Sequence, residues 1–375
     1  MHIGLIIYGG LDTISGGYLY DRMLVEHLCR RGDQVTIISI PWRDYGRHLI
    51  DNLSRFLYRR LERASLDILV QDELNHPSLF WLNRRLRSQV HYPILAIVHH
   101  LRSSEARPTW QNRIYRAVER RYLATVDGFI FNSWCTRAAV EKLVGAGRPA
   151  LVAQPGGDRL RPNLTPDQIV RRARQPGPLR ILFIGNVIPR KGLHTLLDGL
   201  ACLPGGSWRL EVVGRLEVAP AYVQRIRRQI GEAGLGAQVT LWGSLCDAEL
   251  AAHLAQSHLL SVPSSYEGFG IAYLEGMGAG LPAIGSTAGA AGEVITHGRD
   301  GFLVPPGDAQ ALACHVQTLI QDRECLAQMS LAAQQRYTLH PTWAESTERM
   351  RGFLKTWVNG YVRSGQLSFH PLPGG

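Results

Sequence analysis

The stretch Ile3-Gly-Leu-Ile-Ile-Tyr8 is an uninterrupted apolar run of strand length, and it opens the pattern that decides the fold. A glycine-rich loop ending at Ser15-Gly16-Gly17 follows it. A helical pattern then runs from Tyr18 to about Arg31, before a second apolar run, Val35-Thr-Ile-Ile-Ser-Ile40. Strand, helix and strand in this order predict a βαβ unit. Because the strands are apolar along their length, we expect them in a parallel sheet with both faces covered.

The same alternation continues along the chain and then restarts. Further strands are expected at 67–70, 94–98, 128–131 and 150–153, and after the restart at 180–184, 209–213, 238–242, 258–262 and 282–284. Proline, glycine and arginine dominate 155–178, where we place a linker. The pattern predicts an α/β fold of two facing, doubly wound, Rossmann-like domains, 1–157 and 178–340, with an interdomain cleft at the carboxyl ends of their strands. A last helix over 341–363 is expected to cross back to the first domain.

Composition and charge restrict the class of protein. A chain of 375 residues suits two domains, and its net charge of +10 is concentrated in residues 1–157, which hold 21 basic against 14 acidic residues. This surplus favours a polyanionic partner or an acidic membrane surface. No nucleic-acid motif is present, so nucleic acid is not expected as a partner. Six scattered cysteines favour a reducing cytoplasm, and no apolar run approaches the ~20 residues that a membrane span needs.

The segment from Ser264 to Pro282 carries the most specific chemical signal. The expected strand 258–262 stops at Pro263, so Glu267 lies on a loop at a carboxyl end and a helix begins near Gly270. Free backbone N–H groups at the start of a helix, approached through glycines, form a natural seat for phosphate. Glu275, farther along the helix, can reach ribose hydroxyls. Glu267 would meet the group beyond the phosphates, which would be a sugar.

Two carboxylates eight positions apart have other interpretations. They could be ordinary surface residues, or the acid and base of a glycosidase. A hydrolase would not need the phosphate seat, and the flanking glycines and the strand–loop–helix placement favour a nucleotide-sugar site.

The run Glu267-Gly-Phe-Gly-x4-Glu275 resembles the E-x7-E motif of the retaining family 4 glycosyltransferases, which have the GT-B fold. Other stretches along most of the chain are similar to that family: Ser15-Gly16-Gly17, Phe131-Asn-Ser133, Pro155-Gly-Gly-Asp158, Pro189-Arg-Lys-Gly192, Gly292-Glu293-Val-Ile and Asp300-Gly-Phe-Leu-Val-Pro-Pro-Gly-Asp308.

The resemblance implies a role for each matching residue. Glu267 would contact the donor sugar, with help from the backbone amides of Gly268, Phe269 and Gly270. Glu275 would bind the ribose, Lys191 the diphosphate, and the Gly16-Gly17 pair would let the backbone of the first domain approach it. No Asp-x-Asp sequence is present, so neither a metal nor another cofactor is expected.

One position departs from the family pattern. The family has an arginine five residues before the lysine, whereas this chain has Asn186. Arg190, beside Lys191, is a candidate for the second cation; otherwise the site would rely on one cation or Arg190 would be an exposed loop residue.

His99 and His100 follow the expected strand 94–98, again at a carboxyl end. Histidine can hydrogen-bond a hydroxyl or donate to a developing oxyanion. His99 resembles the acceptor-side histidine of the family more closely and is assigned to catalysis beside Glu267. Either residue could instead be a packing histidine.

Residues 47–63 form a basic stretch that is expected to be helical, with apolar residues at 49, 50, 53, 56, 57 and 61. Such a helix can lie on an anionic membrane and present a lipid-linked acceptor. The alternative is a helix whose apolar face covers the core. The first interpretation would place this cytoplasmic protein at the inner face of a membrane.

The expected function is transfer of a sugar from a nucleotide diphosphate to a hydroxyl of a glycan or lipid-linked acceptor. The resemblance implies retention of configuration, with the leaving phosphate accepting the acceptor's proton. A nucleotide-sugar epimerase and a non-catalytic nucleotide-sugar binding protein are the alternatives. A dehydrogenase is the weakest, because no G-x-G-x-x-G occupies the first βα turn. The base, the sugar, the acceptor and the oligomeric state stay unassigned.

Overall fold

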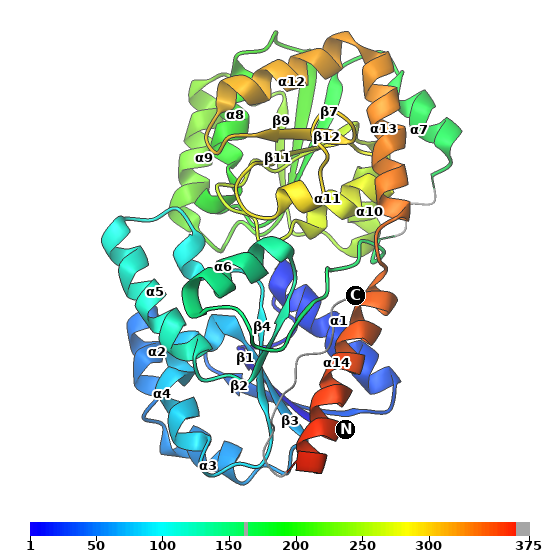
Figure 1. Cartoon of the computed structure of the whole chain (residues 1–375). Helices are drawn as coiled ribbons and strands as arrows, with labels where there is room; N and C mark the ends of the chain where they lie inside the picture. Colours follow the sequence, from blue (N-terminus) through cyan, green and yellow to red (C-terminus); the bar gives the residue numbers. More distant parts are fainter. Residues whose placement is uncertain (161–163, 365–375) are drawn as a thin grey trace. The chain divides into compact units, whose positions relative to one another are not determined.

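The computed structural model describes residues 1–160 and 164–364, and it divides into two compact units. Among the described residues, unit 1 comprises 1–154 and 344–364, and unit 2 comprises 155–160 and 164–343. Each unit is a parallel sheet covered by helices (Figure 1).

Unit 1 has a six-stranded sheet in the order β2-β1-β3-β4-β5-β6, parallel throughout. Its strands are β1 (His2–Tyr8), β2 (Gln34–Ile40), β3 (Ile68–Asp72), β4 (Ile94–Val98), β5 (Gly128–Phe131) and β6 (Ala150–Val152). Its helices are α1 (Gly16–Arg30), α2 (Tyr45–Asp51), α3 (Arg55–Glu62), α4 (His76–Leu86), α5 (Thr109–Leu123) and α6 (Trp134–Val144), with short turns η1 (Glu73–Asn75) and η2 (Arg102–Ser104). The strand order reverses between β1 and β3, and ligands of such sheets bind outside the carboxyl ends at the reversal.

Unit 2 repeats this plan with the order β12-β11-β10-β7-β8-β9. Its strands are β7 (Leu179–Ile184), β8 (Trp208–Val213), β9 (Val239–Gly243), β10 (Leu259–Ser261), β11 (Ala283–Ser286) and β12 (Gly301–Val304). Its helices are α7 (Pro166–Ala173), α8 (Leu193–Ala201), α9 (Pro220–Glu232), α10 (Asp247–Gln256), α11 (Ile271–Gly278), α12 (Ala309–Gln321) and α13 (Arg323–Thr338), with turns η3 (Pro189–Lys191) and η4 (Ala291–Glu293). Here the order reverses between β7 and β10, so the loops that follow these two strands are brought together.

The last helix, α14 (Trp343–Ser364), belongs to unit 1 from residue 344 onward. Glu348 accepts a hydrogen bond from Nε2 of His27 on α1 at 2.8 Å, and Arg351 pairs with Asp33 at 2.5 Å. Arg349 donates to the carbonyl of Val152 at 3.0 Å. Side chains therefore tie this helix to both ends of the unit 1 sheet.

Two local features differ from the sequence expectation. The region 155–178 is not only a linker: Thr165 and Gln168 form a capping box that starts α7, and unit 2 begins at Pro155. The stretch 47–63 is not one helix but two, α2 and α3, separated after Asp51. Residues 161–163 of the expected linker lie outside the described residues.

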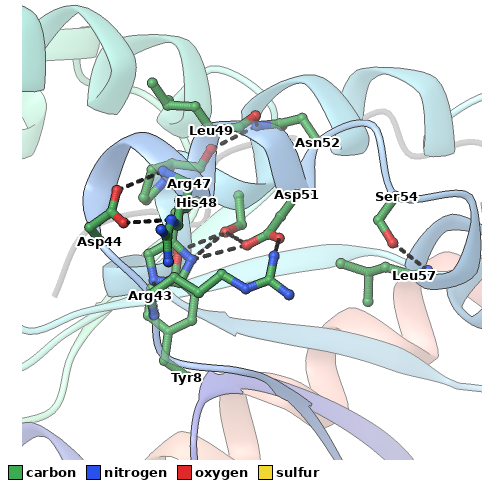
Figure 2. A network of polar contacts seen from close by, with 12 residues as sticks. Tyr8, Arg43, Asp44, Arg47, His48, Leu49, Asp51, Asn52, Ser54 and Leu57 are labelled. Carbon is green, nitrogen blue, oxygen red and sulfur yellow. Dashed lines mark hydrogen bonds and ion pairs between the residues drawn. The ribbon is translucent and has the colours of Figure 1, made fainter.

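Polar side chains cause the break between α2 and α3 (Figure 2). The amide of Asn52 donates to the carbonyls of Leu49 and Pro77, at 3.0 and 2.7 Å, and accepts from the N–H of Trp81 at 2.8 Å. Ser54 then caps α3 by accepting from the N–H of Leu57 at 3.2 Å. Such side-chain bonds to the backbone compete with helix continuation.

Candidate active site

The centre of the candidate site in unit 2 is an ion pair between Lys191 and Glu267. Lys191 lies in η3, after β7, and Glu267 lies in the loop after β10. Nζ of Lys191 is 2.7 Å from Oε2 of Glu267, and the hydroxyl of Ser264 donates to the same oxygen at 3.0 Å. The pair therefore stands at the carboxyl ends of the two strands where the order reverses.

The electrostatics of Glu267 favour its charged form. Burial acts to raise its pKa, but Lys191, Arg190 and the Ser264 hydroxyl outweigh burial and lower the pKa to about 2. A carboxyl group with that pKa is ionised across the physiological range. Glu267 is therefore a fixed negative charge that can accept hydroxyl hydrogen bonds, and it is poorly suited to donate a proton.

Two glycines shape the backbone around Glu267. Gly270 directly precedes α11 with φ of 101°, a left-handed conformation that favours glycine. A Cβ at Gly289 would lie 2.1 Å from the carbonyl oxygen of Glu267, a distance that real side chains do not show. Glycine at both positions therefore lets the backbone run close to Glu267 at the start of α11, where Ile271 and Ala272 are the first residues of the helix and have no intrahelical acceptor for their N–H groups.

Arg190 is held by the same loop that carries Glu267. Its Nη1 donates to the carbonyl of Tyr266 at 2.8 Å, and its own carbonyl accepts from the N–H of Ser265 at 2.7 Å. The guanidinium is close enough to Glu267 to help lower the pKa of that carboxyl. Arg190 thus supplies a second positive charge beside Lys191.

Glu275 on α11 is buried, and its partner was not found by sequence reasoning. Arg159 binds its Oε1 through Nε at 2.9 Å and Nη2 at 2.7 Å, and also contacts Asp247 on α10. Burial still leaves the pKa of Glu275 above its ordinary value, despite Arg159. The only sequence signal for Arg159 is its position directly after Pro155-Gly-Gly-Asp158, in the stretch interpreted as a linker.

Replacing Arg159 by alanine is expected to lower the free energy of unfolding by about 3 kcal/mol, because removing one partner of a buried ion pair strands the other. Urea unfolding measures this change. A matched control is Arg174→Ala, whose pair with Glu324 is more than half exposed and should contribute less than about 1 kcal/mol. Equal losses in the two variants would show that the Arg159–Glu275 pair has no special role.

The predicted residues of unit 1 gather around His99. Nε2 of His99 lies 3.2 Å from Oδ1 of the buried Asp21 on α1, which was not anticipated. A Cβ at Gly17 would lie 3.1 Å from Cδ2 of His99, so Gly17 permits a close approach to this ring; Gly16 is the first residue of α1. His100 instead contacts Oε1 of Glu105 at 2.9 Å.

The surroundings of His99 favour its imidazolium form. Burial acts to lower its pKa, but Asp21, Asp72 and Glu73 outweigh burial and raise the pKa to about 9. The resulting stabilisation is fully present below the unfolded pKa of about 6.5 and is lost as the pH rises through about 9.

We therefore expect the free energy of unfolding to fall by about 2 kcal/mol between pH 7 and pH 9.5, with His99 responsible for most of the change. Urea unfolding at both pH values measures it. The variant His99→Gln should lose most of this pH dependence; a variant with the same pH dependence as the unaltered protein would contradict the assignment.

Comparisons with known proteins agree on one kind of domain. Residues 166–336 match the family described as glycosyl transferases group 1. A GDP-mannose-dependent alpha-(1-6)-phosphatidylinositol monomannoside mannosyltransferase of Mycobacterium tuberculosis is 26% identical, over 64% of this chain and 65% of the relative. The match thus spans just under two thirds of that relative's length.

Solved structures show the fold. Sucrose-phosphate synthase of Thermosynechococcus elongatus superposes with a TM-score of 0.81 at 22% identity, over 95% of this chain and 98% of that one. Anabaena HepE, solved in complex with UDP-glucose, has a TM-score of 0.76 at 21% identity, over 95% and 100% of the two chains. The expected fold class is confirmed: two Rossmann-like α/β units of the GT-B type.

The helices of the described residues contain no segment that is both long and apolar enough to cross a bilayer.

Proposed function

We propose that this chain, whose unit 2 carries a glycosyltransferase group 1 domain, is a retaining family 4 glycosyltransferase that moves a hexosyl group from a nucleotide-diphosphate sugar to a hydroxyl. The observation that carries the proposal is the Lys191–Glu267 pair, 2.7 Å apart beside the glycine-led start of α11. This arrangement puts a cation, a carboxylate and free N–H groups where a sugar diphosphate needs them.

Donor binding would exchange the partners of the ion pair. Lys191, with Arg190 beside it, would turn to the diphosphate, whose charge grows as the sugar leaves. Glu267 would accept hydrogen bonds from the sugar hydroxyls, and the amides of Gly268, Phe269 and Gly270 would hold sugar and phosphate. Glu275, kept in place by Arg159, would accept from the ribose. The fixed cations and backbone dipoles would then stabilise the negative charge on the diphosphate leaving group, so the site would need no metal ion or other cofactor.

The acceptor side is assigned to His99. The released phosphate would accept the proton of the attacking hydroxyl on the same face of the sugar, which retains the anomeric configuration. An imidazolium at His99 would hydrogen-bond an oxygen of the acceptor without removing a proton. The mannosyltransferase relative, whose name describes a phosphatidylinositol mannoside substrate, supports a lipid-linked glycan as the acceptor.

The proposal is tested by following the anomeric proton of the donor by NMR. The purified chain is incubated with GDP-mannose or UDP-glucose, with and without phosphatidylinositol vesicles. Transfer with retention predicts an α-linked product only when vesicles are present. Conversion of the nucleotide sugar without any acceptor would identify an epimerase, and a β-linked product would contradict retention.

We also propose that a surface of unit 1, formed by α2 and α3, binds the cytoplasmic face of an anionic membrane. On α2, His48 and Asp51 face inward: His48 stacks on Tyr8 and Asp51 accepts from Arg43 (Figure 2). Asp51 also accepts from the hydroxyl of Ser78. Ile50, Leu53 and Phe56 are instead 63%, 55% and 77% exposed. Leu57 and Leu61 of α3 are buried, so within residues 47–63 these two side chains pack on the core, as the alternative interpretation expected.

Basic residues accompany these apolar side chains. Exposed arginines flank them along α2 and α3: Arg47, Arg55, Arg59, Arg60 and Arg63. Apolar side chains that enter the acyl boundary, together with cations at the level of the headgroups, are the chemistry of peripheral binding to anionic lipid.

Flotation with vesicles tests this surface. The chain is expected to float with vesicles containing phosphatidylglycerol and not with pure phosphatidylcholine. The double variant Ile50→Ser/Phe56→Ser should bind at least about 10-fold more weakly, because each side chain loses apolar burial of more than about 1 kcal/mol. Leu339→Ser in unit 2 removes a side chain that is 77% exposed and serves as the control. Equal flotation with both kinds of vesicle would contradict the proposal.

A further inference from the structure

Unit 1 contains a buried group of metal-ligand side chains at the carboxyl edge of its sheet. Glu73 lies in η1, directly after β3; His76 begins α4; and Glu119 lies on α5. One ligand atom from each lies within 4.8 Å of the others, and Oε1 of Glu73 is 3.1 Å from Nδ1 of His76. All three residues are at most 3% exposed, so this is not a solvated acidic patch.

Several polar atoms of this group have no hydrogen-bond partner among the described residues. They include Oε2 of Glu119; Oε1 of Glu73 makes no well-aligned hydrogen bond, although Nδ1 of His76 lies 3.1 Å away. The hydroxyl of Tyr122 is also unpartnered among these residues, although Tyr122 is completely buried, and the negative charges of Glu73 and Asp72 contribute to raising its pKa. Buried polar atoms are normally satisfied, so several together indicate that something else occupies the space between them.

The charges of this region do not balance. Four buried carboxyl groups interact with one another here, those of Asp21, Asp72, Glu73 and Glu119. Two cationic side chains face them, His99 and Arg102. With the four carboxyl groups, His99 and Arg102 ionised and His76 neutral, two negative charges are left in a low-dielectric interior, which is unfavourable unless a cation or protons neutralise them.

We infer that Glu73, His76 and Glu119 bind one divalent cation of the Mn²⁺ class. Two carboxylates and one imidazole suit Mn²⁺ or Zn²⁺, and one dication supplies the two missing positive charges. The hydroxyl of Tyr45 lies 3.0 Å from Nε2 of His76 and can accept a hydrogen bond from Nε2–H, which leaves the lone pair of Nδ1 on the side of Glu73. Metal-bound histidines usually have such a partner on the second ring nitrogen.

The ion would replace protons that otherwise neutralise the cluster. Burial, together with Glu119 and Asp72, raises the pKa of Glu73 well above its ordinary value, as expected for a carboxyl group that lacks a counter-charge. Without the ion, Nδ1–H of His76 donates to the carbonyl of Glu73 at 3.0 Å. With the ion bound, the ring proton of His76 would lie on Nε2 beside the Tyr45 hydroxyl, which frees Nδ1 for the ion by a change of tautomer. The ion would join η1, α4 and α5 in unit 1, and it takes no part in donor binding.

Titration of the EDTA-treated full chain with Mn²⁺, without nucleotide, tests the site by calorimetry and electron paramagnetic resonance. We expect one bound Mn²⁺ per chain and a higher melting temperature. Loss of an outer partner costs about 10- to 100-fold in metal affinity, so Glu119→Gln should bind at least about 100-fold more weakly. Tyr45→Phe should bind about 10-fold more weakly. Glu141→Gln, which removes a partly exposed carboxylate on α6, should bind like the unaltered chain.

The ion-free proteins provide a second measurement. Glu119→Gln removes a like charge from beside Glu73, so its ion-free form is expected to melt no lower than the ion-free unaltered chain. Failure to bind Mn²⁺ stoichiometrically, or equal binding by Glu119→Gln, would show that protons alone neutralise the cluster and would overturn the inference. Donor binding is measured separately with nucleotide, so failure of this site would leave the proposed transfer reaction intact.

Discussion

Replacing Lys191 by alanine is expected to weaken binding of the nucleoside diphosphate about 100-fold. A hydrogen bond to a charged group contributes about 1.5–3 kcal/mol, and Lys191 would provide such a bond to the diphosphate. The same change leaves Glu267 buried without its counter-charge, so the free energy of unfolding should fall by about 3 kcal/mol. Calorimetric titration and urea unfolding measure the two effects.

A second substitution separates these effects. The double variant Lys191→Ala/Glu267→Gln removes both charges of the pair and should recover most of the lost stability, while nucleotide binding stays weak. Lys355→Ala, an exposed lysine of α14, is the control for removal of one positive charge. If Lys191→Ala binds nucleotide normally, the lysine is a structural partner of Glu267 and has no role in the donor site.

Replacing Glu267 by glutamine is expected to lower turnover about 10²- to 10³-fold, the usual effect of removing one electrostatic contact at a reacting centre. Binding of the nucleoside diphosphate should change less than about 3-fold, because the amide oxygen of glutamine still accepts from Lys191 and Ser264. Initial rates at saturating donor, with calorimetric binding of the diphosphate, separate the two effects.

The control for this variant is Glu232→Gln on α9, an exposed carboxylate of the same unit, which should leave both quantities unchanged. Unchanged turnover in Glu267→Gln would remove Glu267 from the reacting site. Weakened nucleotide binding with unchanged turnover would place the carboxylate at the nucleotide instead of the sugar.

The strands could be predicted well because buried parallel strands are nearly continuous apolar runs. The run Ile94–Val98 matches β4 in full, and Leu259–Ser261 lies within the expected 258–262. The strand β12 was missed, since Gly301–Val304 is four residues long and begins with glycine. Helix α7 and the break after Asp51 were missed because neither follows from the periodic spacing of apolar residues. Hydrogen bonds from side chains to the backbone determine both features.

The donor-site residues could be proposed from motifs, but their contacts could not. Lys191 and Glu267 are 76 positions apart and meet because β7 and β10 are neighbours, an order that local sequence does not reveal. Arg159 looks like one arginine among many in a loop, and its role depends on the fold that buries Glu275. Asp21 lies within an otherwise ordinary helical pattern, so only the folded arrangement, in which its Oδ1 lies 3.2 Å from Nε2 of His99, identifies it as a partner of that residue.

Lys191, Glu267 and the start of α11 are proposed to hold a nucleotide-diphosphate sugar. The most direct test is the melting temperature of the protein with UDP, GDP or ADP and then with the corresponding sugars, since a ligand that binds only the folded state raises it. One nucleotide is expected to raise the melting temperature, its sugar to do the same, and Lys191→Ala to abolish both shifts. No shift with any of the three nucleotides would contradict the claim.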